Sequence, residues 1–215
     1  MGRSGVARGW WIGRRSAAIL LCVTLAPRPG AAEPRGSDQA RAALDLCFAA
    51  EQAPVGQQVD LLQEGLSHAS DAVAADPDDP VAHFAVFCNL GKRVRRDGLS
   101  FGTLGEVRRL MREIDLTLAL APDYPAALSA KGEMLVALPR LLGGSMREGE
   151  RLARRAVELA PDDVAARFAL VEVLEAQGLR ADAQAEAEAA LALVDRSGHE
   201  ADRSRAEAVV AHLKR

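Results

Sequence analysis

The hexapeptide Ala156-Val157-Glu158-Leu159-Ala160-Pro161 has the form of a helix ending, and versions of it recur along the chain. It aligns with segments 72–77, 117–122 and 190–195, at spacings of 45, 39 and 34 residues. Proline cannot continue a helix, so each segment is expected to close one helix before the next begins. A period in this range is typical of stacked helical hairpins. The sequence therefore predicts an all-α, right-handed solenoid of antiparallel helix hairpins.

The last residues of the four aligned segments form one column of the alignment and divide the chain into four units. They are Pro77, Pro122, Pro161 and Asp195. The predicted units are about 37–77, 80–122, 124–161 and 162–195, and a helix over 197–215 is expected to cap the open end of the stack. Small residues recur at helical spacing in the last two units, which allows paired helices to approach closely. They are Gly132, Gly149, Ala153, Ala156, Ala183, Ala187 and Ala190.

In these small residues and terminal prolines the chain resembles the tetratricopeptide repeat family. It departs from that family where a large aromatic residue normally begins each unit, because His83, Leu128 and Arg167 stand there. A longer turn, 138–145, interrupts the third unit, and Ser145 with Glu148 forms a capping box for the helix after it. This turn is also similar to a segment of the T component associated with tripartite periplasmic transporters.

Composition supports a helical protein. Of the 215 residues 49% are hydrophobic and only 4% aromatic, so the core must be built mainly from Ala, Leu and Val. No segment shows the alternation of β-branched residues that predicts a strand.

The first 32 residues predict a secretory signal peptide. They contain five arginines and no acidic residue, then an apolar run from Ala17 to Ala26, then Ala31-Ala32 before the first acid. The run is too short to span a bilayer, and cleavage after about Ala32 would send the protein to the periplasm or cell envelope, without a transmembrane helix. A twin-arginine signal at Arg14-Arg15 and lipidation at Cys22 remain as alternatives.

Removal of that segment leaves an acidic protein. The whole chain has 27 basic and 30 acidic residues, so residues 33–215 carry 22 against 30, a net charge of −8. A phosphate backbone would be repelled over most of such a surface, which argues against nucleic acid as a partner.

Two cysteines, Cys47 and Cys88, remain after cleavage. An exported chain permits a disulfide between them, but each lies in an apolar helical stretch. The sequence favours two buried free thiols and leaves the disulfide as the alternative.

Catalytic and metal-binding patterns are missing from the sequence. The four histidines are far apart and none has a His, Cys or Glu at metal-ligand spacing, so His83 is expected to be a satisfied core residue. Gly143-Gly144 has no Lys-Ser/Thr after it and no strand before it, which excludes a phosphate loop. We therefore expect no enzyme, no cofactor and no metal.

The resemblance to tetratricopeptide repeats implies a binding groove along the first helices of the hairpins. The positions that it selects are Val81, Phe84, Cys88, Ser129, Glu133, Val136, Phe168, Glu172 and Glu175. Apolar patches flanked by three glutamates suit an apolar or basic peptide. The alternative is that these glutamates only solvate an unoccupied face.

A basic segment gives a second candidate surface, for an acidic partner or anionic lipid head groups. It consists of Lys92, Arg93, Arg95, Arg96, Arg108, Arg109 and Arg112. Solvated helix ends are the simpler interpretation, since cations favour the last turn of a helix.

These features predict a non-enzymatic interaction scaffold of the cell envelope that holds a protein or peptide partner in its concave groove. An accessory component of a periplasmic solute transporter, holding an apolar small molecule, is the alternative function. The sequence identifies neither the partner nor the oligomeric state.

Overall fold

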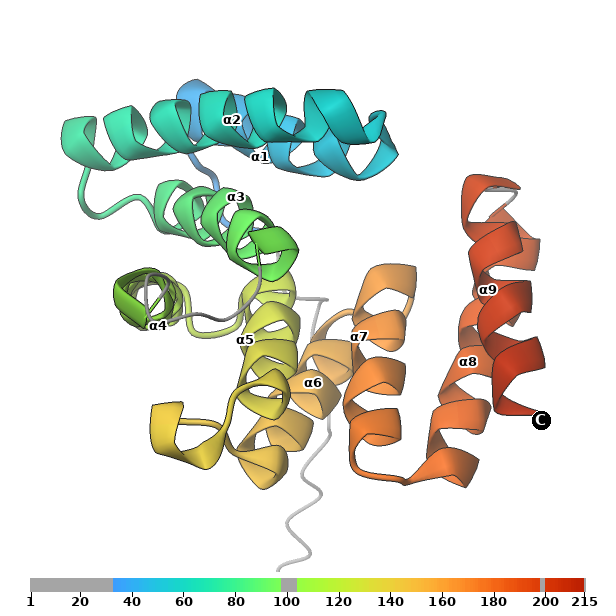
Figure 1. Ribbon diagram of the computed structural model, residues 1–215. Coiled ribbons are helices and arrows are strands. Elements are labelled where there is room, and N and C mark those ends of the chain that lie inside the picture. The colour runs from blue at the N-terminus through green and yellow to red at the C-terminus, as the bar shows by residue number, and fades with distance from the viewer. Residues whose placement is uncertain (1–32, 98–103, 198–199, 215) are drawn as a thin grey trace, which may run out of the picture.

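The computed structural model describes residues 33–97, 104–197 and 200–214, and within these residues it contains helices and no strand. Successive helices form antiparallel hairpins that stack into a solenoid (Figure 1). In chain order they are α1 (Asp38–Gln52), α2 (Val55–Ala75), α3 (Pro80–Asp97), α4 (Leu104–Leu120), α5 (Pro125–Ala137), the short 3₁₀ helix η2 (Arg140–Leu142), α6 (Met146–Leu159), α7 (Val164–Ala176), α8 (Arg180–Ser197) and α9 (Glu200–Leu213).

The proline column does end helices, and the same turn follows each of its first three members. The backbone N–H of Asp79 donates to the Asp76 carbonyl, that of Tyr124 to Ala121, and that of Asp163 to Ala160, at 3.1 to 3.3 Å. Asp195 behaves differently, because α8 continues past it to Ser197. Aspartate keeps its N–H and has a free φ, so it lacks the steric reason for which proline stops a helix.

Local capping explains where several helices begin. The Ser37 hydroxyl accepts a hydrogen bond from the Ala40 N–H, and the Ser145 hydroxyl accepts one from the Glu148 N–H. The predicted capping box is only half formed, since the carboxylate of Glu148 binds Arg151 instead of returning to the backbone. η2 occupies the longer turn of the third unit and ends at Gly143, whose φ of 92° favours glycine.

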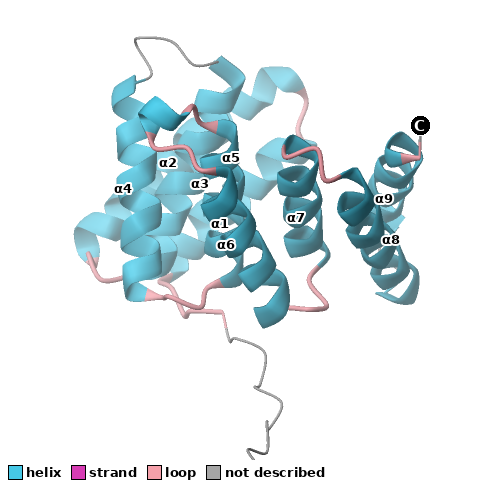
Figure 2. Cartoon of the chain, turned by 90° about the horizontal axis from the view of Figure 1, so that it is seen from below, coloured by secondary structure: helices cyan, strands magenta, loops and turns pink. Residues whose placement is uncertain are grey.

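Small side chains let the helices within a hairpin approach closely, as the sequence predicts. A Cβ atom at Gly132 on α5 would lie 2.8 Å from the carbonyl oxygen of Gly149 on α6. The predicted alanines of α6 and α8 are fully buried, with 0% exposure for Ala153, Ala156, Ala183, Ala187 and Ala190. Seen from below, α8 and α9 lie side by side (Figure 2).

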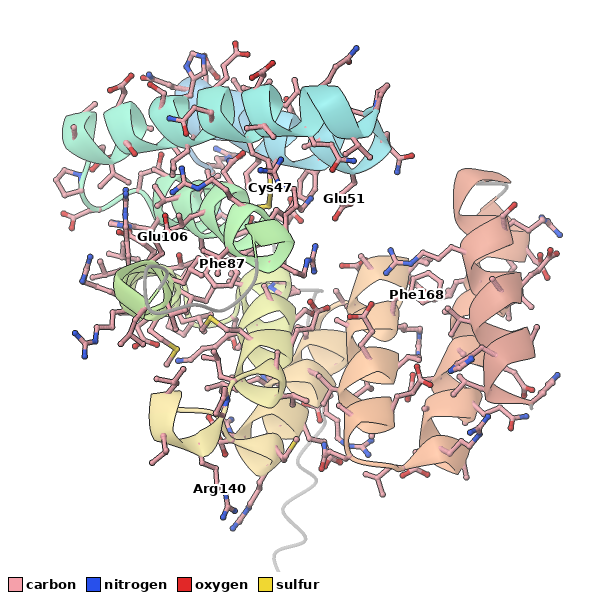
Figure 3. The ribbon with its side chains drawn as sticks, in the orientation of Figure 1. Cys47, Glu51, Phe87, Glu106, Arg140 and Phe168 are labelled. Atoms are coloured by element: carbon pink, nitrogen blue, oxygen red, sulfur yellow. A yellow bond between two sulfur atoms is a disulfide. The ribbon has the colours of Figure 1, made fainter. Side chains whose placement is uncertain are left out.

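A disulfide links the first two units. Cys47 on α1 and Cys88 on α3 are bonded, with their Cα atoms 6.2 Å apart, and the sulfur bridge is visible in Figure 3. The sequence-based preference for two free thiols is therefore wrong. The apolar residues around each cysteine correctly predicted a helical position turned toward the core. The packing of α1 beside α3 then brings the two cysteines together.

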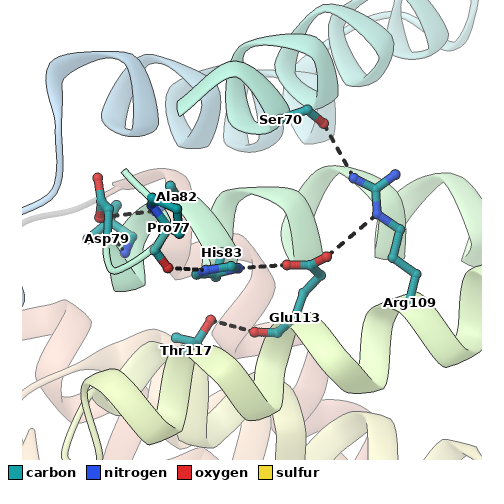
Figure 4. Close-up of polar contacts among 9 residues, drawn as sticks. Ser70, Pro77, Asp79, Ala82, His83, Arg109, Glu113 and Thr117 are labelled. Atoms are coloured by element: carbon teal, nitrogen blue, oxygen red, sulfur yellow. Dashed lines mark hydrogen bonds and ion pairs between the residues drawn. The ribbon is translucent and has the colours of Figure 1, made fainter. Parts of the chain in front are cut away.

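His83 is a satisfied core histidine, as predicted, and only 4% of it is exposed. Its Nε2–H donates to the Pro77 carbonyl at 2.8 Å, and its Nδ1 lies 2.7 Å from the buried carboxyl of Glu113 on α4 (Figure 4). Arg109 extends the network, because its Nε is 3.6 Å from Glu113 and its Nη2 donates to the Ser70 hydroxyl. This polar network fastens α3 to α4 and to α2.

Asp79 fastens the start of the described chain to α3. Burial raises its pKa, but hydrogen bonds from the backbone of Ser37, Ala82 and Val81 more than offset that effect and lower the pKa. The carboxylate is thus a helix cap that also holds the chain before α1.

The segment 1–32, with Arg14, Arg15 and Cys22, lies outside the described residues, as do 198–199 and Arg215 of the predicted capping helix. In the described part of the chain, no helix is long and apolar enough to cross a membrane.

Candidate functional site

The odd-numbered helices, which are the first of each hairpin together with α9, lie along the inner side of the stack (Figure 1). Helix α3 packs beside α1, and α7 packs beside α5. We call this side the inner face and define it by the charged residues Glu51, Lys92, Arg95, Glu133, Glu172 and Arg205.

Glu133 on α5 is the point at which charges from all five odd-numbered helices converge. Burial raises its pKa to about 7, and the negative charges of Glu172 on α7 and Glu51 on α1 add to this shift. Arg95 on α3 and Arg205 on α9 act in the opposite direction. Among the described residues, the carboxyl of Glu133 has neither a hydrogen-bond partner nor an ion-pair partner, so it is a partly buried acid without a direct counter-charge.

Lys92 on α3 contacts α1 and lies at the edge of the inner face that is nearest to α1. Its Nζ lies 2.8 Å from the Glu51 carboxylate and donates to the Cys47 carbonyl, also at 2.8 Å. The same ammonium group stands over the Phe48 ring, 5.4 Å from its centroid, and 52% of Phe48 is exposed. Burial lowers the Lys92 pKa against the opposing effect of Glu51. Figure 3 shows Glu51 at the end of α1 nearest to α9.

Arg205 forms the α9 side. Its guanidinium carbon lies 4.7 Å from the centroid of the Phe168 ring, and its Nη2 lies 3.4 Å from the Glu172 carboxylate. His212, further along α9, lies 3.3 Å from Glu175. Side chains of α9 therefore reach α7, so α9 does more than close the end of the stack.

Only part of the groove that the sequence predicts is available to a partner. Glu133 and Glu172 belong to the inner face, and Glu175 follows Glu172 on α7, but the apolar positions and Ser129 are buried in the fold. Exposure is 3% for Val81, 5% for Phe84, 8% for Ser129, 9% for Val136 and 3% for Phe168.

Contacts outside each helix account for this burial. A Cβ atom at Gly36 would lie 2.3 Å from Val81, so the chain before α1 covers that valine. Phe84 packs edge-on against Tyr124 at 5.1 Å, and Phe168 lies in a cluster with Ala190 and Ala206. Cys88 is in the disulfide. These are corrections to the projection of Phe84 and Phe168 as exposed groove side chains, whereas binding by the glutamates stays a prediction.

The structure divides the predicted basic segment into separate places. Lys92 and Arg95 belong to the inner face. Arg93 pairs with Glu106, and Arg109 joins the Glu113 network, so both serve the contact between α3 and α4. Arg96 makes an interaction of its own. Arg108 and Arg112 remain exposed on α4.

Sequence reasoning missed Phe48, Glu51 and Arg205. Glu51 lies 41 residues before Lys92, the same offset that separates Cys47 from Cys88. An alignment of the first unit with the second at this offset would therefore have identified Glu51. Arg205 had no such signal, because its role depends on how α9 packs against α7.

The inner face offers charged groups and the exposed ring of Phe48 for contact with a partner. No group of three His, Cys, Asp or Glu side chains able to hold a metal ion occurs in residues 33–97, 104–197 and 200–214. The sulfur atoms of Cys47 and Cys88 are bonded to each other.

Comparison with known proteins connects this architecture to solved structures. No protein-family model matches the chain, and no curated protein matches it. Among solved structures it is similar to TTC0263, a thermophilic TPR protein of Thermus thermophilus, with a TM-score of 0.57 and 18% identity over 80% of this chain and 81% of that one. It also matches MamA from Desulfovibrio magneticus, with a TM-score of 0.47 and 15% identity over 84% and 97% of the two chains.

The similarity to the transporter T component has no counterpart among these structures and stays a prediction. The agreement with TTC0263 extends over most of both chains, so the repeat period, the hairpins and the solenoid are those of a known architecture. The chain has the fold of a tetratricopeptide repeat protein.

Proposed function

We propose that this protein is a non-enzymatic scaffold of the cell envelope that binds a basic segment of a protein partner on its inner face. The observation that carries the proposal is Glu133, a partly buried carboxyl without a direct counter-charge at the convergence of five helices. A Lys or Arg side chain of a partner would supply the missing positive charge.

The surroundings of Glu133 favour a peptide over an isolated ion. Glu172 lies nearby and adds negative charge, although Arg205 already contacts its carboxylate at 3.4 Å, and the exposed ring of Phe48 offers apolar contact on the α1 side. Rigid packing of the helices means that little ordering of the scaffold is needed when the partner binds. The basic partner residue would then displace part of the interaction that Arg95 and Arg205 make with Glu133.

Selection from a random peptide library tests the proposal with a defined probe. We expect selected peptides to be rich in Lys and Arg, and Glu133→Lys to weaken their affinity about tenfold or more. Asp60→Lys, on the exposed outer side of α2, makes the same charge change and should leave the affinity within about twofold. Selection of acidic peptides, or equal loss of affinity in both variants, would reject the proposed function.

The pH dependence gives an independent readout. As the pH falls below about 7, Glu133 takes up a proton and loses its charge, so the affinity for a basic peptide should fall in that range. The variant Glu133→Gln should show weaker binding and a flatter pH profile between about pH 6 and pH 8, whereas a purely apolar mode of binding would give the same profile in both proteins.

We also propose that the chain is exported and cleaved, as the first 32 residues indicate. N-terminal sequencing of protein recovered outside the cytoplasm should begin at Glu33, and a lipid-modified Cys22 at the N-terminus would contradict this.

A further inference from the structure

A second surface lies at the insertion in the third unit, away from the inner face. Here η2 and the first half of α4 line an open pocket of about 270 Å³ formed by Leu104, Val107, Arg108, Met111, Leu141 and Leu142. Gly143 closes the turn, and a Cβ atom there would lie 3.5 Å from the Met111 methyl group. The turn is therefore held against the helix.

Leu141 protrudes from this surface. Its exposure is 98%, the highest among the exposed large hydrophobic residues of the described chain. Of its two chain neighbours, Arg140 is exposed to solvent, whereas Leu142 lines the pocket. A leucine that contacts almost nothing contributes no packing to the fold, so its burial would have to come from outside the chain.

Three arginines belong to the same two segments as the pocket. Arg108 lines the pocket with Leu141, Arg112 follows it one helical turn later on α4, and Arg140 points away from the ribbon (Figure 3). None of the three has an ion-pair partner among the described residues, and the nearby acid of α4, Asp115, is bound by Lys131 at 2.6 Å. On a chain whose residues 33–215 carry a net charge of −8, this is a local positive surface with an apolar tip.

We propose that this surface, which we call the insert patch and define by Leu104, Arg108, Met111, Arg112, Arg140 and Leu141, docks onto an anionic lipid surface. The arginines attract lipid phosphates, and Leu141 enters the outer edge of the acyl chains. A fluid lipid layer accepts a protruding side chain without a shaped pocket. A protein partner would need a complementary cavity and is usually anchored by aromatic residues or Arg in a closed pocket.

Flotation of the full mature chain with lipid vesicles tests this docking. The probes are vesicles of phosphatidylcholine alone and vesicles of phosphatidylcholine and phosphatidylglycerol in a three-to-one ratio. We expect binding to the anionic vesicles only, weakening as salt rises because exposed charges are screened. The partition coefficient should fall about tenfold in Leu141→Ser and about twentyfold or more in Arg108→Glu with Arg112→Glu.

Val55→Ser is the matched control, because Val55 is 76% exposed at the start of α2, away from the insert patch. It should bind anionic vesicles as the unchanged protein does. All variants change exposed side chains, so circular dichroism and the affinity of the inner face for its selected peptide should be preserved, which separates this test from that of the proposed function.

Several results would overturn the proposal. Equal binding to neutral and anionic vesicles would remove the role of the arginines, and unchanged binding of Leu141→Ser would remove the role of the apolar tip. If the unchanged protein does not float with anionic vesicles, the lipid assignment is wrong. Loss of an acidic protein partner in the same variants would then assign the patch to a protein contact.

Discussion

Glu133 is the residue whose chemistry depends most on its neighbours. Burial raises its pKa from about 4.5 to about 7, with Glu172 as the next contributor, so the folded protein binds a proton more tightly than the unfolded chain does. The unfolded chain therefore loses this proton first as the pH rises. The free energy of unfolding should decrease as the pH rises from about 4.5 to about 7 and then level off.

Replacing Glu133 by Gln should remove that decrease. We expect Glu133→Gln and the unchanged protein to be of similar stability near about pH 4, and the variant to be more stable at about pH 8 by on the order of 1–3 kcal/mol. Urea titrations at the two pH values measure the difference. Equal stability at the higher pH would mean that solvent screens the carboxyl and that burial does not control its charge.

Phe168 is the second residue whose environment decides its role. Its ring is 3% exposed, lies under Arg205 and packs with Ala190 and Ala206. Phe168→Ala should lower the free energy of unfolding by about 3 kcal/mol, because it empties a buried ring site. Denaturant unfolding should show this loss, whereas the exposed Phe48→Ala should cost less than about 1 kcal/mol. A small loss for Phe168→Ala would return that ring to the inner face as a contact for partners.

At the scale of elements, α5 and α6 approach each other closely at two glycines. The backbones of Gly132 and Gly149 approach each other so closely that an added Cβ atom at Gly132 would lie 2.8 Å from a carbonyl oxygen, which cannot rotate away. Gly132→Ala should therefore destabilise the protein by about 1–3 kcal/mol, even though alanine favours a helix more than glycine does.

Gly105 on α4 provides the matched control for that substitution. An added Cβ atom there meets nothing within 4 Å, so Gly105→Ala should be neutral or stabilise by up to about 1 kcal/mol. Thermal unfolding of both variants measures the difference in sign. If both substitutions shift the melting temperature equally, helix propensity alone controls these positions and the close approach is unimportant.

At the scale of the whole molecule, stability is distributed along the stack by contacts between neighbouring units. The Cys47–Cys88 disulfide closes a loop with a sequence separation of 41 between α1 and α3. Loop-closure entropy assigns such a cross-link about 4 kcal/mol as an upper estimate. Reduction should lower the free energy of unfolding by up to this amount.

The effect of reduction should also be local. Hydrogen exchange should accelerate in α1 and α2, which the disulfide ties to α3, and should change little in α7, α8 and α9. Replacing both cysteines by alanine should reproduce the effect without reductant. Uniform acceleration over all helices would show that the solenoid unfolds as one cooperative unit.

The sequence by itself determined the helices, their hairpins and the tight interfaces. Helix endings depend on proline and on capping groups within a few residues, and alanines at spacings of three and four define the close-packed face of a helix wherever it packs. These are local properties, so segments 72–77, 117–122 and 156–161 and the buried Ala153, Ala156, Ala183 and Ala187 were predictable. The satisfied core role of His83 followed from its packing position.

Only the tertiary structure decided what lies next to what across the units. The disulfide required α1 and α3 to lie side by side, and the burial of Phe168 required Ala190 of α8 and Ala206 of α9 to pack against its ring. The raised pKa of Glu133 also depends on charges that are distant in sequence. Glu51, one of the residues that act on it, lies 82 positions earlier in the chain. Periodicity indicates which face of a helix is buried, but the angle and offset between helices set these distances, and they arise only when the whole stack packs.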